Sequence, residues 1–275
     1  MFYRARFSQG FLPQVSRLRQ VFPALGVGAL PQRTEQKVIT GLVVALPEEL
    51  TTLTLKKIDK GQCLLLTDKM LVAYSGAGPA NAQAAAELLV AQGATRLISW
   101  GCAAALSASL KPGDLVLADK LVDAEGGTGA AFCVCTDWHS YTQSILASFV
   151  AVHTGCLAES KSIVSSSNDK KQRQALTGAV ALDMESIAVA KVAKRYAYPF
   201  LAIRVIADPV DMNLPRAMSY ALNDRGDMVL GKLLLFLALH PAELPGLIKL
   251  GLHFNAAKNT LKSIAGQLDK VNRYN

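Results

Sequence analysis

Residues 184–208, MESIAVAKVAKRYAYPFLAIRVIAD, join two hydrophobic patterns end to end. The first pattern, through residue 197, has small apolar residues at helical spacing and stops before Pro199, which cannot continue a helix. The second, residues 200–208, is a strongly apolar run that ends at Asp208 and predicts a buried strand. A helix that leads into such a strand is typical of an α/β fold.

The same alternation extends over most of the chain. Strands are predicted over 38–46, 70–76, 96–101, 114–123 and 200–208, and helices over 80–93 and 184–197. Neither an internal repeat nor a Ser/Gly-rich linker divides this region. We therefore expect one α/β domain over residues 38–240, a basic N-terminal extension (1–37) and a basic amphipathic C-terminal helical region (241–275).

The cysteines and histidines do not form a metal site by their spacing. Five cysteines are scattered without a CxxC pair, and the four histidines are equally dispersed. This usage favours a reducing compartment, and it predicts no metal and no cofactor. The chain is 51% hydrophobic, which is enough for a large core.

The net charge of +8 is concentrated at the two ends of the chain. Residues 1–37 carry six basic residues against one acidic, and residues 228–275 carry six against two. Aromatic residues are not interleaved with these cations as a stacking groove requires, so no nucleic-acid partner is expected. An anionic lipid surface fits the ends at least as well, and we expect a cytoplasmic protein with peripheral contact to the inner membrane face.

Two apolar segments bear on that expectation. Residues 2–22 mix Arg with Phe, Leu and Val and resemble an amphipathic arm or a transit-like sequence, with a floppy extension or an upstream start codon as the alternative. The run over residues 228–254 is confined by Lys232 and Pro241 to less than the roughly 20 residues of a bilayer span. A buried or interfacial helix is expected there.

Polar and small residues follow four of the predicted strands at the point where each ends. They are Pro47, Glu48 and Glu49, then Ser75 to Pro79, then Cys102 to Ala105, and finally Asp208. Ligands of α/β sheets bind at the carboxyl ends of strands, so these positions predict the site. Burial can raise the pKa of Asp208 so that it keeps a proton to donate, although an ordinary turn aspartate before Pro209 is the alternative.

The glycine-containing turn SGAGPANAQ (75–83) can bring backbone N–H groups, such as that of Gly78, to a ligand or anion. Asn81 stands where a dinucleotide fingerprint has its third glycine, and GxxxxGK[ST] does not occur. Neither a nicotinamide site nor a P-loop is therefore expected. Taken in isolation, Glu48 and Glu49 are explained by the favourable interaction of acidic residues with the dipole at a helix N-terminus.

Taken together, DMESIAVA (183–190), FLAIRVIAD (200–208) and LKPGDLVLAD (110–119) resemble the nucleoside phosphorylase and nucleosidase superfamily, which includes methylthioadenosine/S-adenosylhomocysteine nucleosidase. The likeness covers residues 38–240. Residues 177–218 and HPAELPGLIKL (240–250) look most like its hopanoid-associated phosphorylase branch, which implies adenosylhopane as substrate and hopanoid biosynthesis as context. The resemblance implies a three-layer α/β/α fold with a central mixed sheet, in a homodimer or larger homo-oligomer.

The resemblance also implies roles for individual residues. Met184 would lie against the ribose, Glu185 would accept hydrogen bonds from its hydroxyls, and Asp208 would protonate the imidazole-ring nitrogen of the departing purine. Glu49 matches the acid that activates water in the nucleosidases. The remaining substrate-binding positions are Ser75, Gly78, Cys102, Ala103 and Arg204, of which Arg204 would orient Asp208 or form a structural ion pair.

The chemistry needs two different carboxyl groups. Cleavage of an N-glycosidic bond develops positive charge on the sugar and negative charge on the base, so one carboxyl must stay charged and the other must stay protonated. Glu185 suits the first requirement and Asp208 the second.

Two departures from the family pattern bear on whether water or phosphate attacks the sugar. The positions that hold phosphate in the phosphorylases correspond to Ser99 and Cys102, neither of which is a cation. The nucleosidase motif GSAGGL is GCAAAL here, so the added methyl groups of Ala104 and Ala105 are expected to narrow or reshape the pocket. Hydrolysis is expected at least as much as phosphorolysis, with inorganic phosphate as the alternative co-substrate.

Three other functions stay open at this point. The enzyme could act on soluble methylthioadenosine or S-adenosylhomocysteine, the chain could be a non-catalytic nucleoside- or lipid-binding relative, or, more remotely, it could bind nucleic acid.

Overall fold

The computed structural model describes residues 38–125, 131–221 and 230–274. The predicted N-terminal extension, residues 1–37, lies outside the described residues. The strands are β1 (Thr40–Val44), β2 (Gln62–Thr67), β3 (Met70–Tyr74), β4 (Arg96–Ala105), β5 (Leu115–Asp123), β6 (Phe132–Cys133), β7 (Val152–Glu159), β8 (Ala181–Asp183) and β9 (Phe200–Asp208). The helices are α1 (Pro47–Leu50), α2 (Pro79–Ala91), α3 (Thr136–Leu146), α4 (Ser167–Thr177), α5 (Ser186–Arg195), α6 (Arg216–Ala221), α7 (Leu230–Leu239), α8 (Leu244–Ala265) and α9 (Leu268–Val271), with a 3₁₀ turn at Pro241–Glu243.

These strands form one mixed sheet in the order β2-β3-β1-β4-β8-β7-β5-β6, and β9 pairs with both β4 and β5. β4 is parallel to β1 and β9, whereas β5 is antiparallel to β9. The strands β4, β8, β7, β5 and β9 therefore pair in a closed circuit. This circuit brings the ends of β4, β8 and β9 together.

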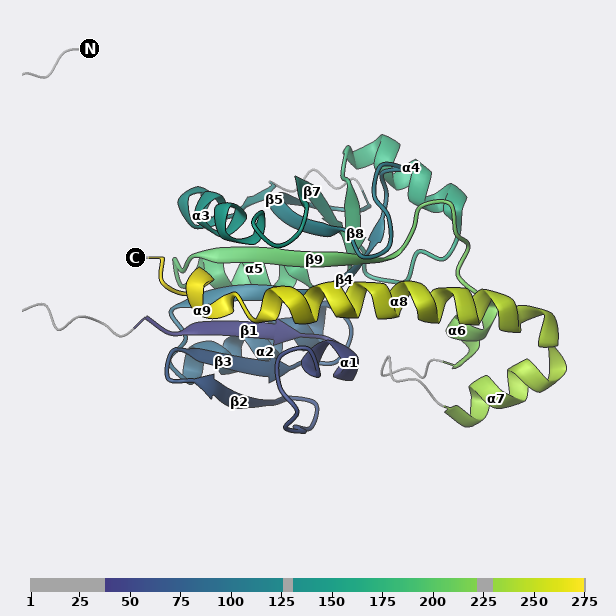
Figure 1. The fold of residues 1–275 in the computed structure, drawn as a ribbon, viewed down its shortest axis with the longest axis horizontal. Coiled ribbons are helices and arrows are strands. Elements are labelled where there is room, and N and C mark those ends of the chain that lie inside the picture. Colours follow the sequence, from purple (N-terminus) through teal and green to yellow (C-terminus); the bar gives the residue numbers. More distant parts are fainter. Residues whose placement is uncertain (1–37, 126–130, 222–229, 275) are drawn as a thin grey trace, which may run out of the picture. The chain divides into compact units, whose positions relative to one another are not determined.

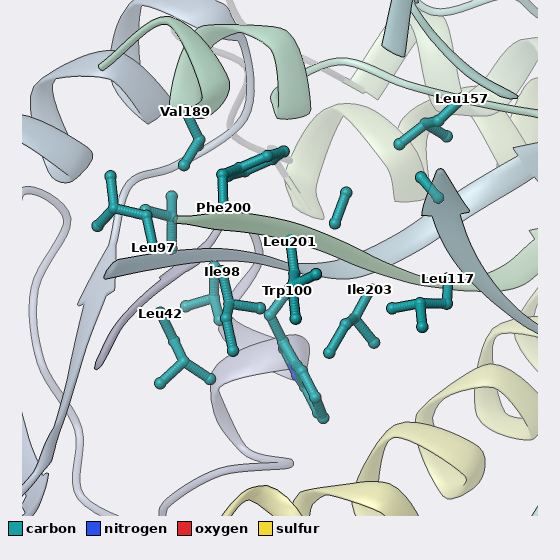
Figure 2. Close-up of a cluster of buried hydrophobic side chains, with 14 of the residues drawn as sticks. Leu42, Leu97, Ile98, Trp100, Leu117, Leu157, Val189, Phe200, Leu201 and Ile203 are labelled. Carbon is teal, nitrogen blue, oxygen red and sulfur yellow. The ribbon is translucent and has the colours of Figure 1, made fainter. Parts of the chain in front are cut away.

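Helices cover both faces of the sheet. α2 and α5 pack against each other on one face, and α8 lies along β9 on the other (Figure 1). Figure 2 shows Val189 and Phe200 on one side of the strands, and Leu42, Ile98 and Trp100 on the other. The expected three-layer α/β/α fold with a central mixed sheet is confirmed.

All five predicted strands and both predicted helices are present, with shifted ends in most cases. The strand predicted over 96–101 continues to Ala105, because small residues extend it beside β8 and β9. Among the longer elements, β2, β7, α3 and α4 had no prediction. β2 is half-exposed, and α4 (SNDKKQRQALT) is mostly polar, so neither gives a strong hydrophobic pattern.

The C-terminal helices divide into two parts. Ala257, Leu261, Ile264, Leu268 and Val271 are buried in the main hydrophobic core, so the second half of α8 and α9 contribute to the domain itself. The first half of α8 and α7 expose large apolar side chains. Among the helices that the structure describes, none is both long and apolar enough to cross a membrane.

Candidate active site

Four buried carboxylic acids lie where β1, β8 and β9 end. Glu49, Asp183, Glu185 and Asp208 are each at most 8% exposed. Buried carboxyl groups are costly unless hydrogen bonds or cations compensate them, so their partners define the site. Half-buried Met184, Cys102, Ala104 and Gly78 occupy the neighbouring positions.

Glu49 is held in α1, directly after β1. Its Oε2 accepts hydrogen bonds from the backbone N–H groups of Ala45 and Leu46, both at 3.0 Å, and its Oε1 accepts one from Cys102 N–H at 2.7 Å. Burial raises the pKa of Glu49, and the Arg204 charge and these backbone hydrogen bonds oppose that rise. The carboxyl is thus fixed in orientation and made more basic, as a proton acceptor must be.

Arg204, in the middle of β9, is a buried cation, 1% exposed, that lies among three of these acids. We call Arg204 together with Glu49, Asp183 and Glu185 the Arg204 cluster. Its Nε donates to Asp183 Oδ2 at 2.6 Å, and its Nη2 donates to Ser99 Oγ at 2.6 Å and to Ser186 Oγ at 3.1 Å. Nη2 also lies 3.9 Å from Glu185 Oε2. Burial lowers the pKa of Arg204, but the negative charges of Asp183, Glu185 and Glu49 together raise it by more than burial lowers it. The guanidinium therefore stays charged.

Of the two roles expected for Arg204, to orient Asp208 or to form a structural ion pair, the structure shows an ion pair, and its partner is Asp183. Between β4 and β9 the paired residues pass from Ala103 and Ile206 to Ala104 and Asp208, so Ala207 is an extra residue in the ladder. This bulge interrupts the regular alternation of side chains along β9, so the spacing of four residues does not place Arg204 and Asp208 as neighbours on one face.

Gly101, opposite Arg204 in the sheet, leaves the room that the cluster needs. A Cβ at this position would lie 2.4 Å from Glu49 Oε1 and 2.5 Å from Arg204 Nη1. No larger residue fits without moving one of the two charged groups. Sequence reasoning assigned roles to Cys102 and Ala103 in the same motif and missed this glycine.

Glu185 links α5 to the turn after β3. Its Oε1 accepts a hydrogen bond from Gly78 N–H at 2.9 Å, and its Oε2 accepts one from Met184 N–H at 3.3 Å. Gly78 has φ +97°, a conformation that glycine adopts readily, so the turn can present its N–H to the carboxylate. Burial raises the pKa of Glu185, and the Arg204 charge opposes the rise.

The other predicted positions have distinct places. Ser75 is buried, and its Oγ lies within hydrogen-bond distance of two carbonyl oxygens, that of Val44 at 3.0 Å and that of Gly76 at 2.7 Å, so its hydroxyl lies between β1 and the turn. Ala103 is buried in β4. Burial and the neighbouring Glu49 raise the pKa of Cys102 well above its usual range, so its thiol stays neutral. Met184 is half-buried between Asp183 and Glu185.

Asp208 has a different partner, Lys170 of α4, which sequence reasoning missed. Lys170 Nζ lies 2.6 Å from Asp208 Oδ1, and the lysine has no exposed surface. Burial raises the pKa of Asp208 to about 6, although Lys170 acts in the opposite direction. A mostly polar helix gave no signal that one of its lysines would be buried.

Asp183 connects the start of α5 to Arg204. Its Oδ1 accepts hydrogen bonds from the backbone N–H groups of Glu185 (3.4 Å) and Ser186 (3.3 Å), while its Oδ2 accepts from Arg204 and from Ser186 Oγ. These contacts fix the start of α5 and the guanidinium together. Within the described parts of the chain, no group of three His, Cys, Asp or Glu side chains could hold a metal ion.

Comparisons with known proteins identify the family and the fold. A sequence model of the phosphorylase superfamily matches residues 41–228. None of the curated protein sequences matches the chain. Among solved structures, the 5′-methylthioadenosine/S-adenosylhomocysteine nucleosidase of Helicobacter pylori is similar, with 19% identity, a TM-score of 0.64, and coverage of 86% of this chain and 98% of that one.

Two further structures are similar to the same extent. Futalosine hydrolase of Helicobacter pylori has 18% identity, a TM-score of 0.64, and coverage of 86% of this chain and 97% of its own. The 5′-methylthioadenosine/S-adenosylhomocysteine nucleosidase of Neisseria meningitidis, solved with methylthio-immucillin-A, has 20% identity, a TM-score of 0.63, and coverage of 85% and 99%. At these identities the likeness establishes a shared fold.

Proposed function

We propose, because this chain belongs to the phosphorylase superfamily, that it is an enzyme that cleaves the N-glycosidic bond of a purine nucleoside with an apolar 5′ substituent. The observation that carries the proposal is the presence of two buried carboxyl groups with different cations. Glu185 belongs to the Arg204 cluster, whereas Asp208 pairs with Lys170. The two groups thus have different electrostatic surroundings, which two carboxyl groups with different roles in one reaction require.

The proposed reaction assigns one step to each group. As the bond from C1′ to the purine breaks, its electron pair goes to the base, and Asp208 gives its proton to the imidazole-ring nitrogen. Glu185 accepts hydrogen bonds from the ribose hydroxyls and stabilises the positive charge on the sugar, while Met184 lies against the ring. Water adds to C1′ and gives its proton to Glu49. The products are the free purine and the free sugar.

Hydrolysis is favoured over phosphorolysis by the charges around Arg204. One guanidinium faces three carboxyl groups, those of Glu49, Asp183 and Glu185, so its charge is already compensated. A phosphate dianion would meet further negative charge here, whereas neutral water would not. A second cation, Lys60, packs against Gly76 in the neighbouring turn. The experiment therefore compares reactions with and without phosphate.

The experiment measures adenine release from adenosylhopane and from methylthioadenosine, each with and without phosphate. Proposed hydrolysis predicts equal rates in both buffers and a free sugar as product. A rate that requires phosphate and yields a sugar 1-phosphate would show phosphorolysis. Release from neither nucleoside under either condition would contradict the proposed reaction.

The proposed substrate is adenosylhopane, a lipid-linked nucleoside, which would place the enzyme in hopanoid biosynthesis. The support comes from the resemblance of residues 177–218 to that branch and from apolar side chains exposed near the site. Gly246 of α8 lies against Pro215, in the segment that follows Asp208. The alternative is a soluble substrate of the kind that the similar nucleosidases are named for, methylthioadenosine or S-adenosylhomocysteine.

We also propose a peripheral lipid contact at the α7–α8 surface, which we define as Leu235, Leu239, Leu244, Ile248 and Leu252. Each is 47–69% exposed. On α8 the last three recur at every fourth position, on the face turned away from the buried Leu261 and Ile264. The same face continues as Asn255, Asn259 and Lys262 where the helix covers the core.

The change along one helix face argues for lipid as the occupant. A face that met only water would stay polar throughout, as it does over the core. Exposed Lys249 adjoins the apolar part and can pair with an anionic headgroup, in keeping with the basic C-terminal region. Assembly through a second copy of this chain is the competing occupant.

Substitution tests this surface better than truncation, because removal of residues 228–275 would delete buried core residues. The triple variant Leu244→Ser, Ile248→Ser, Leu252→Ser should weaken binding to phosphatidylglycerol-containing vesicles about tenfold or more, since each serine loses apolar area. The double variant Asn255→Ser, Asn259→Ser is the control and should bind as wild type. Unchanged vesicle binding, or conversion of an oligomer to a monomer by the triple variant, would contradict the lipid contact.

A further inference from the structure

Lys170 is a fully buried cation outside the Arg204 cluster. Its ammonium group donates to Asp208 Oδ1 at 2.6 Å, to Pro209 O at 3.0 Å and to Met212 O at 2.8 Å. A lysine has three N–H donors, so all three are satisfied and the side chain has one orientation. Only one of these acceptors is a carboxylate, which makes Asp208 the anion that Lys170 compensates.

The same helix end is joined to the segment after β9 by two further contacts. Ser167 N–H donates to Asn213 Oδ1 at 2.7 Å, and Leu214 N–H donates to Ser165 O at 2.8 Å. α4 lies near the end of the sheet at which β9 finishes (Figure 1). Lys170 therefore connects the carboxyl to a rigid helix as well as to its own loop.

We infer that Lys170 is a positioning residue for the reaction. It holds Asp208 Oδ1, so that Oδ2, the other carboxyl oxygen, carries the proton that is transferred to the purine. This inference rests on the proposed function. When the proton leaves, the carboxylate remains paired with the Lys170 ammonium, so the charge that forms on Asp208 is stabilised as it develops. Lys170 itself contacts no substrate atom in this scheme and transfers no proton.

The charges that act on Asp208 come from two places. Lys170 of α4 lowers the pKa of the carboxyl, while burial and the negative charge of exposed Asp211, in the following loop, raise it to about 6. On β4 the residue in register with Asp208 is Ala104, which is uncharged. Without the lysine, burial would act unopposed and Asp208 would hold its proton more tightly.

The test compares the pH dependence of kcat for wild type and Lys170→Met. Asp208 must be protonated at the start, so wild-type kcat falls as pH rises through its pKa. In Lys170→Met this fall should move upward by about 1–3 pH units, and the plateau at lower pH should be about 3- to 30-fold lower because a weaker acid gives up its proton less readily. KM should change little.

Matched variants separate positioning from a structural role. Lys171→Met removes the adjacent, exposed lysine and should leave the profile unchanged. Lys170→Arg keeps a cation, so the pH at which kcat falls should return toward the wild-type value. Lys170→Gln should behave like Lys170→Met. A folded Lys170→Met or Lys170→Gln enzyme whose pH profile does not move would overturn the inference.

A measurement without turnover keeps the two proposals distinguishable. Titration of the Asp208 carboxyl by ¹³C NMR should give a higher pKa in Lys170→Met than in wild type. If wild type releases no adenine from any nucleoside, the proposed function fails, and this titration still decides whether Lys170 controls the protonation of Asp208. An unchanged carboxyl titration would overturn the role of Lys170 on its own.

Discussion

Asp208→Asn should lower kcat for adenine release by about 10²- to 10⁴-fold, the usual contribution of a general acid. Asparagine has nearly the same shape and can still accept a hydrogen bond from Lys170, but it has no carboxyl proton to give to the leaving purine. Nucleoside binding should stay within a few-fold of wild type, since Glu185 and Met184 are unchanged. The measurements are steady-state adenine release and the dissociation constant of a nucleoside.

The pH profile gives this prediction a second readout. With the pKa of Asp208 raised to about 6, the acid is protonated below that pH and ionised above it, so wild-type kcat should fall as pH rises past it. Asp208→Asn should lose this fall together with most of the rate. Asp211→Asn, at an exposed neighbour, is the control and should retain most of the activity. Turnover undiminished in Asp208→Asn would contradict the assignment, and a binding-only relative would have no turnover to lose.

Arg204→Met should destabilise the fold by about 3–5 kcal/mol, the usual effect of removing one partner from a buried ion cluster. The substitution leaves Asp183 without its cation and removes the positive charge beside Glu185 and Glu49, while methionine fills much of the same volume. The measurement is the free energy of unfolding in urea. Arg195→Met, which breaks the exposed ion pair with Glu87, is the matched control and should cost less than about 1 kcal/mol.

The loss in Arg204→Met should depend on pH in a defined direction. Without the guanidinium, Glu49 and Glu185 have pKa values further above those of the unfolded chain. The folded variant then binds more protons than the unfolded chain, so its stability rises as pH falls. The deficit relative to wild type should therefore shrink between pH 8 and pH 5. A deficit that does not vary with pH would indicate that packing, rather than uncompensated charge, causes the loss.

Much of the fold and part of the site could be predicted from local sequence patterns. The apolar run 200–208 becomes β9 with both ends as predicted, because a continuous apolar stretch that ends in Asp and Pro has few other favourable conformations. Placement of ligands at strand ends likewise brought Glu49 and Cys102 into consideration, and the family resemblance added Glu185. Hydrogen bonds or ion pairs link each of them to the Arg204 cluster or its neighbours. α4 and β2 were missed because their polar or half-exposed faces give weak periodicity.

The sequence by itself therefore determined the α/β architecture and the carboxylic acids that end its strands, since both follow from hydrophobic periodicity within short segments. Only the tertiary structure decided which cation each acid receives. The bulge at Ala207 interrupts the alternation of side chains between Arg204 and Asp208, and folding brings Lys170 to Asp208 from 38 residues earlier in the chain. Such pairings depend on strand register and on contacts between distant segments, and the energy of a buried charge is set by those contacts rather than by its neighbours in sequence.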